Sequence, residues 1–376
     1  MATITKSIGT AGRDYSTITS WEAALAGAAG GAGNDAVGEC YDDSAFDEAV
    51  TINDATPASI TLTVAAGQRH DGTAGTGARI VRTAASSAVL SFAAASFART
   101  VSWLSLAPAA GVDIIVGISR SSNNSGTLGI KNCLIFGMNK SVTNYSVAAM
   151  QLTGSEPAVV INTIVYSVTK SDSGSGIAAG IIAQGSSATS HIDNNTVYKV
   201  TSNSSTGAAA LGYDYTDDAD VKLKNNIGMA TGGSTSGTKA DFEIASPVNA
   251  VTGTNMSSDT SAPGTGSLIS KSSANQFVST AVGSEDLHLK SGADAIDAGT
   301  DLGTTPSGVQ FDIDGYDRDA AGVVWDMGAD EYVTTPPSGI PNRPALAQLR
   351  QQATGRTQHN NNGSRDAATG RQAYPS

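Results

Sequence analysis

The sequence predicts an all-β fold, a right-handed parallel β-helix (solenoid) with about 30 residues per coil. The first observation is a short apolar phrase with a central asparagine, which recurs at steps of 30, 32 and 31 residues, at Asn132, Asn162, Asn194 and Asn225. A second apolar phrase keeps the same period half a coil away and contains Met150, Ile181, Leu211 and Phe242. A fixed period of this size is typical of units that stack to share one core.

The composition fits many short strands and tight turns. Aromatic residues make up 5% of the chain and charged residues 15%, and there are 42 glycines among 376 residues. Small and β-branched residues suit a pleated strand, and glycine and asparagine suit corners. A disordered chain would carry more charge and fewer valines and isoleucines.

The net charge of -12 is unevenly distributed along the chain. Residues 334–376 contain five arginines and one acidic residue, Asp366, and so carry +4, which leaves -16 for residues 1–333. An acidic body argues against nucleic acid as its ligand. We therefore expect no nucleic-acid partner and treat the basic tail as a separate unit.

The two cysteines, Cys40 and Cys133, are too distant to indicate a disulfide framework or a metal cluster. Cys133 takes the place of Thr163 and Asn195 in the repeated phrase, which predicts a small buried residue. Residues 1–10 lack the apolar core of a signal peptide, and no apolar run approaches the ~18 residues of a membrane span. The expectation is a protein made in a cytoplasm, without a membrane partner.

Residues 1–35 are expected to form a first strand and a capping helix. Ile18 and residues 21–25 have the spacing of a short amphipathic helix. Thr19 and Glu22 have capping-box spacing, and Gly30 would end the helix. A solenoid leaves the interior of its first coil open, so an atypical element must cover it, and we assign that role to this helix.

Residues 36–256 are expected to form the coils. In their less regular first part, strands are predicted at 49–52, 60–64, 78–81, 89–92, 101–104 and 114–116. The glycine-rich stretch from Gly67 to Gly77 lacks the Gly-Lys-Ser/Thr ending of a phosphate-binding loop, and no helical pattern follows it. A connecting turn is the expectation for this stretch.

The most regular coils lie between residues 129 and 256. Stacking would place equivalent residues about 4.8 Å apart. The asparagines at 132, 162, 194 and 225 are therefore expected to form a ladder in which each side-chain amide bonds the next. The alternative is a polar row that binds a ligand.

Residues 257–333 differ from the coils and are expected to close the β-helix. They contain the runs LHLKSGADAIDAGTDLG, DIDGYDRD and WDMGADEY. Together these runs resemble the closing segment of right-handed parallel β-helix proteins of the pectin-lyase-like type, and IGTAGRDYSTITSWEAAL resembles the opening of such proteins. The resemblance covers residues 1–333. It implies the fold and leaves the activity open, since this fold serves lyases, hydrolases, adhesins and viral spikes.

Residues 334–376 are expected to form a basic extended tail that anchors the chain to a partner. Several prolines stiffen its start, and residues 344–353 have the pattern of one short helix, with proline in its first turn and Gly355 after its end. The residues expected to contact the partner are Arg343, Leu346, Leu349, Arg350, Arg356, Arg365 and Arg371.

Glycoside hydrolysis requires two carboxylates about 5–9.5 Å apart. Asp193, Asp214 and Asp241 come from successive coils and are the candidates, together with Asp172, Asp217, Asp218 and Asp220. The motif set of the polygalacturonases is absent, and residues 128–256 contain no arginine that could serve a pectate-type lyase. We therefore predict no catalytic residues and expect a solvated acidic loop around Asp217.

Aspartates alternate in the loop from Asp312 to Asp319, as oxygen donors do in a calcium loop, but the bidentate acid of an EF-hand is missing. We expect these aspartates to cap turns, with Arg318 paired to Asp312 or Asp314.

The four histidines, at 70, 191, 288 and 359, are isolated in the sequence, and His288 is expected to face outward from a strand. The prediction is that the protein binds no metal and no other cofactor.

These observations favour a structural protein of a bacteriophage particle, as a head decoration, vertex protein or tail-associated spike bound to other virion proteins through its tail. The resemblance contributes here, since β-helices of this texture are frequent in phage particles, and viral spikes imply a homotrimer by analogy. One alternative is a spike depolymerase that cleaves a host surface glycan. The other is a bacterial adhesin, which a secretion signal or a C-terminal anchor should accompany.

Overall fold

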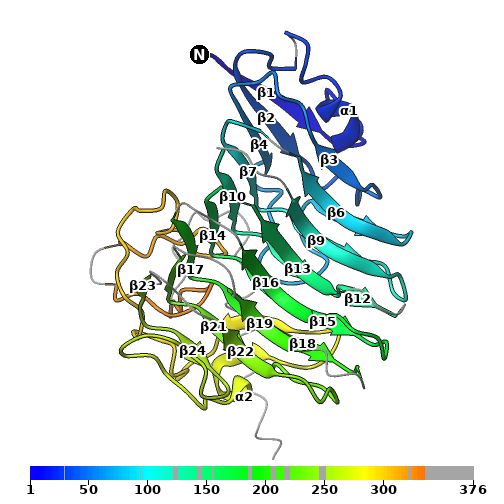
Figure 1. Cartoon of the computed structure of the whole chain (residues 1–376). Helices are drawn as coiled ribbons and strands as arrows, with labels where there is room; N and C mark the ends of the chain where they lie inside the picture. The colour runs from blue at the N-terminus through cyan, green and yellow to red at the C-terminus, as the bar shows by residue number, and fades with distance from the viewer. Residues whose placement is uncertain are drawn as a thin grey trace, which may run out of the picture.

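A computed structural model describes residues 1–334 except 29, 94, 122–125, 142–145, 155, 185–188, 205–208, 216–220, 245–250 and 321–322. Apart from Thr334, the predicted tail lies outside these residues, and with it Arg343, Leu346, Leu349, Arg350, Arg356, Arg365 and Arg371. The described chain is a parallel β-solenoid of about seven turns, which confirms the predicted all-β fold class (Figure 1). No helix in this part of the chain is long and apolar enough to cross a membrane.

Three sheets of parallel strands form the walls of the solenoid, and a complete coil contributes one strand to each. Sheet A contains β1 (Thr3–Ile8), β2 (Asp35–Cys40), β4 (Ser59–Val64), β7 (Arg99–Ser102), β10 (Leu128–Lys131), β14 (Ala158–Ile161), β17 (Ser190–Asp193), β20 (Val221–Lys224) and β23 (Val251–Thr252). Sheet B contains β5 (Arg79–Arg82), β8 (Ser105–Pro108), β11 (Leu134–Phe136), β15 (Ile164–Lys170), β18 (Thr196–Ser202), β21 (Ile227–Met229) and β24 (Met256–Ser257), with β12 (Asn139–Lys140) beside β15. Sheet C contains β3 (Val50–Ile52), β6 (Ser86–Phe92), β9 (Ile114–Ser121), β13 (Val147–Thr153), β16 (Ala178–Gln184), β19 (Ala210–Asp214) and β22 (Lys239–Glu243).

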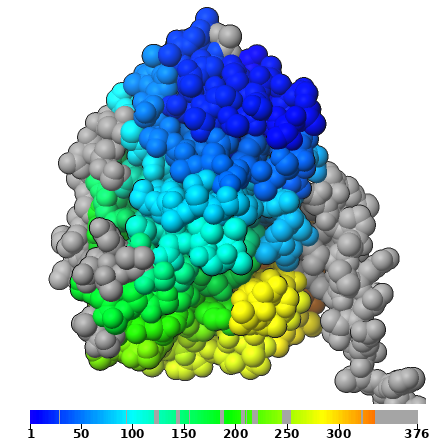
Figure 2. Space-filling view, turned by 90° about the vertical axis from the view of Figure 1, so that its right-hand side faces the viewer, coloured from blue at the N-terminus to red at the C-terminus, as the bar shows by residue number. Residues whose placement is uncertain are grey.

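The register of the sheets sets the period of the solenoid. Met150 pairs with Ile181, a step of 31 residues, and Leu134 pairs with Ile164, a step of 30. Chemically similar residues therefore lie above one another, and Figure 2 shows the coils stacked in sequence order from the blue N-terminus to the green coils. Met150, Ile181 and Tyr213 are fully buried and belong to one continuous apolar interior. Each of the six strands predicted between 36 and 128 is present, and β2 and β8 are additional.

Helix α1 (Ile18–Glu22) covers the first coil, as expected, with Trp21 fully buried. The predicted capping box of Thr19 and Glu22 is wrong. Thr17 is the N-cap residue, its side chain accepts a hydrogen bond from the backbone N–H of Ser20, and the Ser20 hydroxyl accepts one from the N–H of Thr17. The helix therefore begins two residues earlier than the predicted box implies.

The closing segment, residues 257–333, first completes the last coil, where Leu268 forms a bridge with Met256. The short helix α2 (Ser273–Gln276) follows, and then β25 (Phe277–Ser279) pairs antiparallel with β26 (Asp286–Leu289). The remaining residues run back along the outside of the solenoid, so that the orange part of the chain lies beside β14 and β17 (Figure 1).

This return covers parts of the outward faces of sheets A and B. On sheet B, apolar side chains of the coils and of the closing segment form a second core, which includes Leu134, Ile164, Ile227, Phe277, Leu287, Leu289, Ile313 and Met327. On sheet A, Ile161 packs with Val309 and Trp325 of the closing segment. Where the closing segment packs on them, the two walls have apolar contacts on both sides, as in parallel sheets that are covered on both faces.

The predicted asparagine column lies at the corner between sheets A and B. All four residues, Asn132, Asn162, Asn194 and Asn225, have a left-handed backbone with φ between 51° and 57°. Asparagine tolerates this conformation better than most residues do, which explains its recurrence. Only one of the expected amide bonds between neighbouring coils forms in this column, from Asn225 to Asn194 at 3.0 Å. The other side-chain amides bond backbone carbonyls of the closing segment.

The ladder lies one residue further along the chain, inside the coils. The side-chain oxygen of Asn226 accepts hydrogen bonds from the backbone N–H and the side-chain amide of Asn195. In the next coil, the side-chain oxygen of Asn255 accepts hydrogen bonds from the same two groups of Asn226. Asn195 in turn accepts from the N–H of Thr163, and Cys133 holds the first position and is fully buried, as expected. The residue after each left-handed corner lies in the dry interior, where its polar groups must bond the adjacent coils.

We expect the substitution Asn226→Ala to lower the free energy of unfolding by about 2–4 kcal/mol, because buried backbone groups of two neighbouring coils lose their partners. Asn226 is fully buried, and its amide nitrogen also bonds the carbonyls of Ile192 and Lys224. Urea denaturation followed by circular dichroism measures the change. The control is Asn53→Ala at an exposed position, expected to shift stability by less than about 0.5 kcal/mol. Equal losses in the two variants would contradict the interior ladder.

Candidate functional site

Among the carboxylates considered for glycoside hydrolysis, those that the structure describes are buried. Asp193, Asp214 and Asp241 are 2%, 2% and 0% exposed. Asp193 lies on sheet A, where its carboxylate is 3.2 Å from the Nδ1 atom of His191 and accepts from the N–H of Lys224 at 3.1 Å. Asp214 lies on sheet C, a different wall of the solenoid, and accepts from the side chain of Gln184 at 3.3 Å.

Asp241 is bonded through both of its oxygens. One accepts from the backbone N–H of Thr231 at 3.1 Å, and the other accepts from the backbone and the hydroxyl of Ser258 at 2.7 and 2.6 Å. Burial raises the pKa of Asp241 and of Asp193. Asp172 forms a buried ion pair with Lys170 at 2.5 Å. Asp217, Asp218 and Asp220 lie outside the described residues, and the described candidates form no open pair of carboxylates.

The loop from Asp312 to Asp319 begins with a turn cap, as expected. One oxygen of Asp312 accepts two backbone N–H groups of the loop, at 2.9 and 2.6 Å, and the other accepts the N–H of Glu331 at 3.1 Å. The expected pairing of Arg318 with Asp312 or Asp314 is wrong, because Arg318 pairs with Glu331 at 2.6 Å in the interior of the closing segment. The side chain of Asp314 faces His288 instead.

His288 on β26 is the centre of a buried cluster of chemically active side chains. The expectation that His288 faces outward from its strand is wrong, since His288 is 0% exposed. Its Nδ1 atom lies 2.5 Å from Asp286, and its Nε2 atom lies 3.4 Å from Asp314. Asp330 completes the group, and one potential ligand atom each from His288, Asp314 and Asp330 lies within 4.8 Å of the others.

Three stretches of the closing segment position this cluster. Asp286 and His288 are two residues apart on β26 and so lie on the same face of the strand. Asp314 belongs to the turn that Asp312 caps. Asp330 follows Met327 and Ala329 of the second core, and its carboxylate accepts from the N–H of Leu289 at 2.7 Å. The cluster therefore forms only when the closing segment has folded onto itself.

The electrostatics of the cluster favour a positive charge at His288. Burial by itself would lower the pKa of this histidine, but the carboxylates of Asp314, Asp330 and Asp286 raise it well above its ordinary value. The arrangement can therefore hold one cation between the carboxylates, either as a proton on the imidazole or as a metal ion bound by it. All three potential ligands are buried or nearly so, with side-chain exposures of 0% for His288 and 3% for Asp314.

The glycine-rich loop of residues 67–77 packs directly against this cluster. A Cβ atom on Gly72 would lie 2.5 Å from the Nε2 atom of His288, so no side chain fits there. His70 in the same loop is 2% exposed, with its Nε2 atom 2.9 Å from the carbonyl of Asn132 and its Nδ1 atom accepting the N–H of Gly72. Burial lowers the pKa of His70 to about 4, so this histidine is neutral at pH 7.

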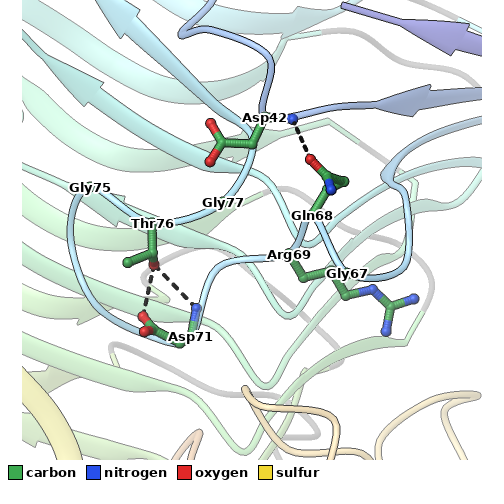
Figure 3. A pocket seen from close by; sticks show the side chains of 8 residues that line it. All are labelled: Asp42, Gly67, Gln68, Arg69, Asp71, Gly75, Thr76 and Gly77. Carbon is green, nitrogen blue, oxygen red and sulfur yellow. Dashed lines mark hydrogen bonds between the residues drawn. The ribbon is translucent and has the colours of Figure 1, made fainter. Parts of the chain in front are cut away.

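On its solvent side the same loop lines a shallow depression of about 500 Å³ (Figure 3). Asp71 accepts from the hydroxyls of Thr73 and Thr76, at 2.6 and 2.7 Å. The guanidinium carbon of Arg69 lies 4.3 Å from the ring centre of Trp103. These contacts hold the loop in its own compact turn, which fits the connecting turn expected from the sequence.

The His288 cluster is the part of the site that sequence reasoning missed. The four histidines were treated as isolated, yet His70 and His288 both lie within the junction of loop 67–77 and the closing segment. One signal was available, since Asp286 and His288 alternate on a short strand and share one face. The approach of Asp314 and Asp330 depends on tertiary contacts that no spacing in the sequence encodes.

The buried neutral state of His70 predicts how stability depends on pH. Its folded-state pKa of about 4 lies below the ordinary value of 6.5, so its contribution is complete above about pH 6.5 and is lost as the pH falls towards 4. The full effect is on the order of 3 kcal/mol. Urea midpoints at pH 7.5 and 4.5 should differ more for the wild type than for His70→Gln, in which this group cannot ionise. Equal pH dependence in the two proteins would contradict a buried neutral His70.

No family model, no curated protein and no solved structure matches this chain. The assignment of the fold therefore rests on the register of the three sheets.

Proposed function

We propose that this chain is a structural, non-enzymatic protein of a bacteriophage particle, as a head decoration, vertex protein or tail-associated spike, attached to capsid or tail proteins by residues 334–376. The observation that carries the non-enzymatic part is the closing segment lying over the outer faces of sheets A and B. It covers the surface where a polysaccharide would have to meet coil residues on those two walls.

The fate of the candidate carboxylates supports this proposal. A glycosidase must present two carboxylates to one sugar ring. Asp193 and Asp214 lie on different sheets, and Asp241 is bonded through both oxygens to Thr231 and Ser258. Carboxylates that are buried and hydrogen-bonded to neighbouring groups stabilise the coils, and their substitution should affect folding before it affects any chemistry.

The charge distribution supports attachment through the tail. Residues 1–333 carry a net charge of -16 and the tail carries +4. Copies of an acidic body repel one another in solution, which keeps them apart until a specific contact forms. Arginines can form bidentate bonds with carboxylates of a partner protein. The resemblance to pectin-lyase-like β-helices, with their frequent use in phage particles, favours a virion as the location and a homotrimer as the oligomer.

We expect deletion of residues 334–376 to abolish incorporation into particles while it leaves the solenoid folded, because the paired strands and the buried core of the coils are formed by residues before 334. Mass spectrometry of purified particles measures incorporation, and thermal unfolding measures the fold. A matched control keeps the tail and replaces Arg343, Arg350, Arg356, Arg365 and Arg371 by glutamine, which tests the charge alone. Incorporation of the tail-less chain at the wild-type level would refute anchoring by the tail.

The alternative of a depolymerase makes an opposite prediction for Asp214→Asn. If the chain is structural, wild type and variant should both release no oligosaccharide from host capsule above a buffer control, as measured by chromatography of labelled products. Burial of Asp214 predicts lower stability of the variant, by about 1–3 kcal/mol, from the changed bond to Gln184. Release by the wild type that Asp214→Asn abolishes would replace the structural proposal with the enzymatic one.

A further inference from the structure

The His288 cluster has a feature that a buried ion pair alone does not explain. The Nε2 atom of His288 is completely buried and has no hydrogen-bond partner, and it points towards Asp314 at 3.4 Å. A charge-assisted N–H···O bond would be shorter, at about 2.7–2.9 Å. The separation matches that of two ligands on one metal ion, because atoms about 2.1 Å from a tetrahedral centre lie about 3.4 Å apart.

The orientation of the imidazole is also that of a metal ligand. The Nδ1 atom of His288 faces the carboxylate of Asp286 at 2.5 Å, which directs Nε2 away from β26 and into the space shared with Asp314 and Asp330. Metal-binding histidines usually bond a carboxylate or a carbonyl through the nitrogen that does not bind the metal, because this fixes the ring and raises its basicity. Asp286 is placed to have this positioning role.

We propose that His288, Asp314 and Asp330 bind one divalent first-row transition-metal ion, which fastens the closing segment into its docked form. A site with one imidazole and two carboxylates suits zinc and its neighbours, whereas calcium and magnesium favour sites made of oxygen ligands only. The three ligands come from β26, from the turn after Asp312 and from the residues after Met327. The proposal replaces the sequence-based expectation of no metal and is independent of the virion proposal.

The position of the site gives the ion a structural role. The ligands are buried, and Gly72 of the loop 67–77 closes over His288, so a substrate has no access to the metal. A metal bound only by the folded form stabilises that form by an amount set by its concentration and affinity. The ion would therefore join three stretches of the closing segment next to the coil that contains Asn132.

The test measures zinc in the full chain. The protein is unfolded in urea with a chelator and refolded with excess zinc sulfate. One part is desalted for plasma mass spectrometry, and the other is melted in a calorimeter with the zinc still in excess. We expect about one zinc per chain and a melting temperature at least 5 °C above that of protein refolded with chelator, since a ligand at ~1,000 times its Kd contributes about 4 kcal/mol. Cobalt in place of zinc should give visible absorption bands that the metal-free chain lacks.

Two ligand variants and one control decide the outcome. Asp314→Asn and His288→Gln should each lose the bound zinc and the rise in melting temperature, whereas Asp319→Asn, an exposed aspartate of the same loop, should retain both. If His288→Gln does not refold, Asp314→Asn decides, because it preserves the size of the side chain. A folded wild type that binds no zinc, or an Asp314→Asn variant that binds zinc as the wild type does, would overturn the proposal.

Discussion

The docking of the closing segment onto the asparagine column is the interaction on which the rest of the structure depends. Each asparagine turns the chain from sheet A to sheet B through a left-handed backbone, and its side chain then bonds the returning segment. Asn132 donates to the carbonyl of Asp312 at 2.5 Å, Asn162 to that of Gly308 at 3.1 Å and Asn225 to that of Thr300 at 2.8 Å. One residue type therefore makes the corner and also binds the segment that covers it.

This docking changes what the outer surface of the coils can do. Sheet A carries Asp193 and Lys131 on its outer face, and the covering segment gives Lys131 the carbonyl of Ser307 as a partner at 2.8 Å. Next to them, Ile161 packs with Val309 and Trp325. Because a charged group that is buried must be bonded, the buried Asp193 on this face is committed to the fold. Where the closing segment covers sheets A and B, little free surface remains for a substrate.

Most of the fold could be predicted from the sequence, because coils that pair with their neighbours repeat the same residues at a fixed interval. The interior ladder lies one residue after the column that the sequence predicts, and the reason is physical. Asn194 and Asn195 are adjacent and chemically identical, and only the left-handed backbone of Asn194 separates the corner from the interior. The return of the closing segment could not be predicted, since its bonds to the asparagines join residues 75 to 180 positions apart. The His288 cluster depends on that return and was missed with it.

The composition of the cluster indicates why the docked form is specific. Apolar contacts of the second core would hold the closing segment in several related positions, since they are not directional. A buried histidine among three carboxylates is directional, because a cation between them is stabilised only when Asp286, Asp314 and Asp330 all reach their places. A misplaced segment would leave an uncompensated charge in a dry environment, which costs several kcal/mol. Polar groups at this junction therefore select one docked arrangement, and the apolar faces of sheets A and B provide most of its stability.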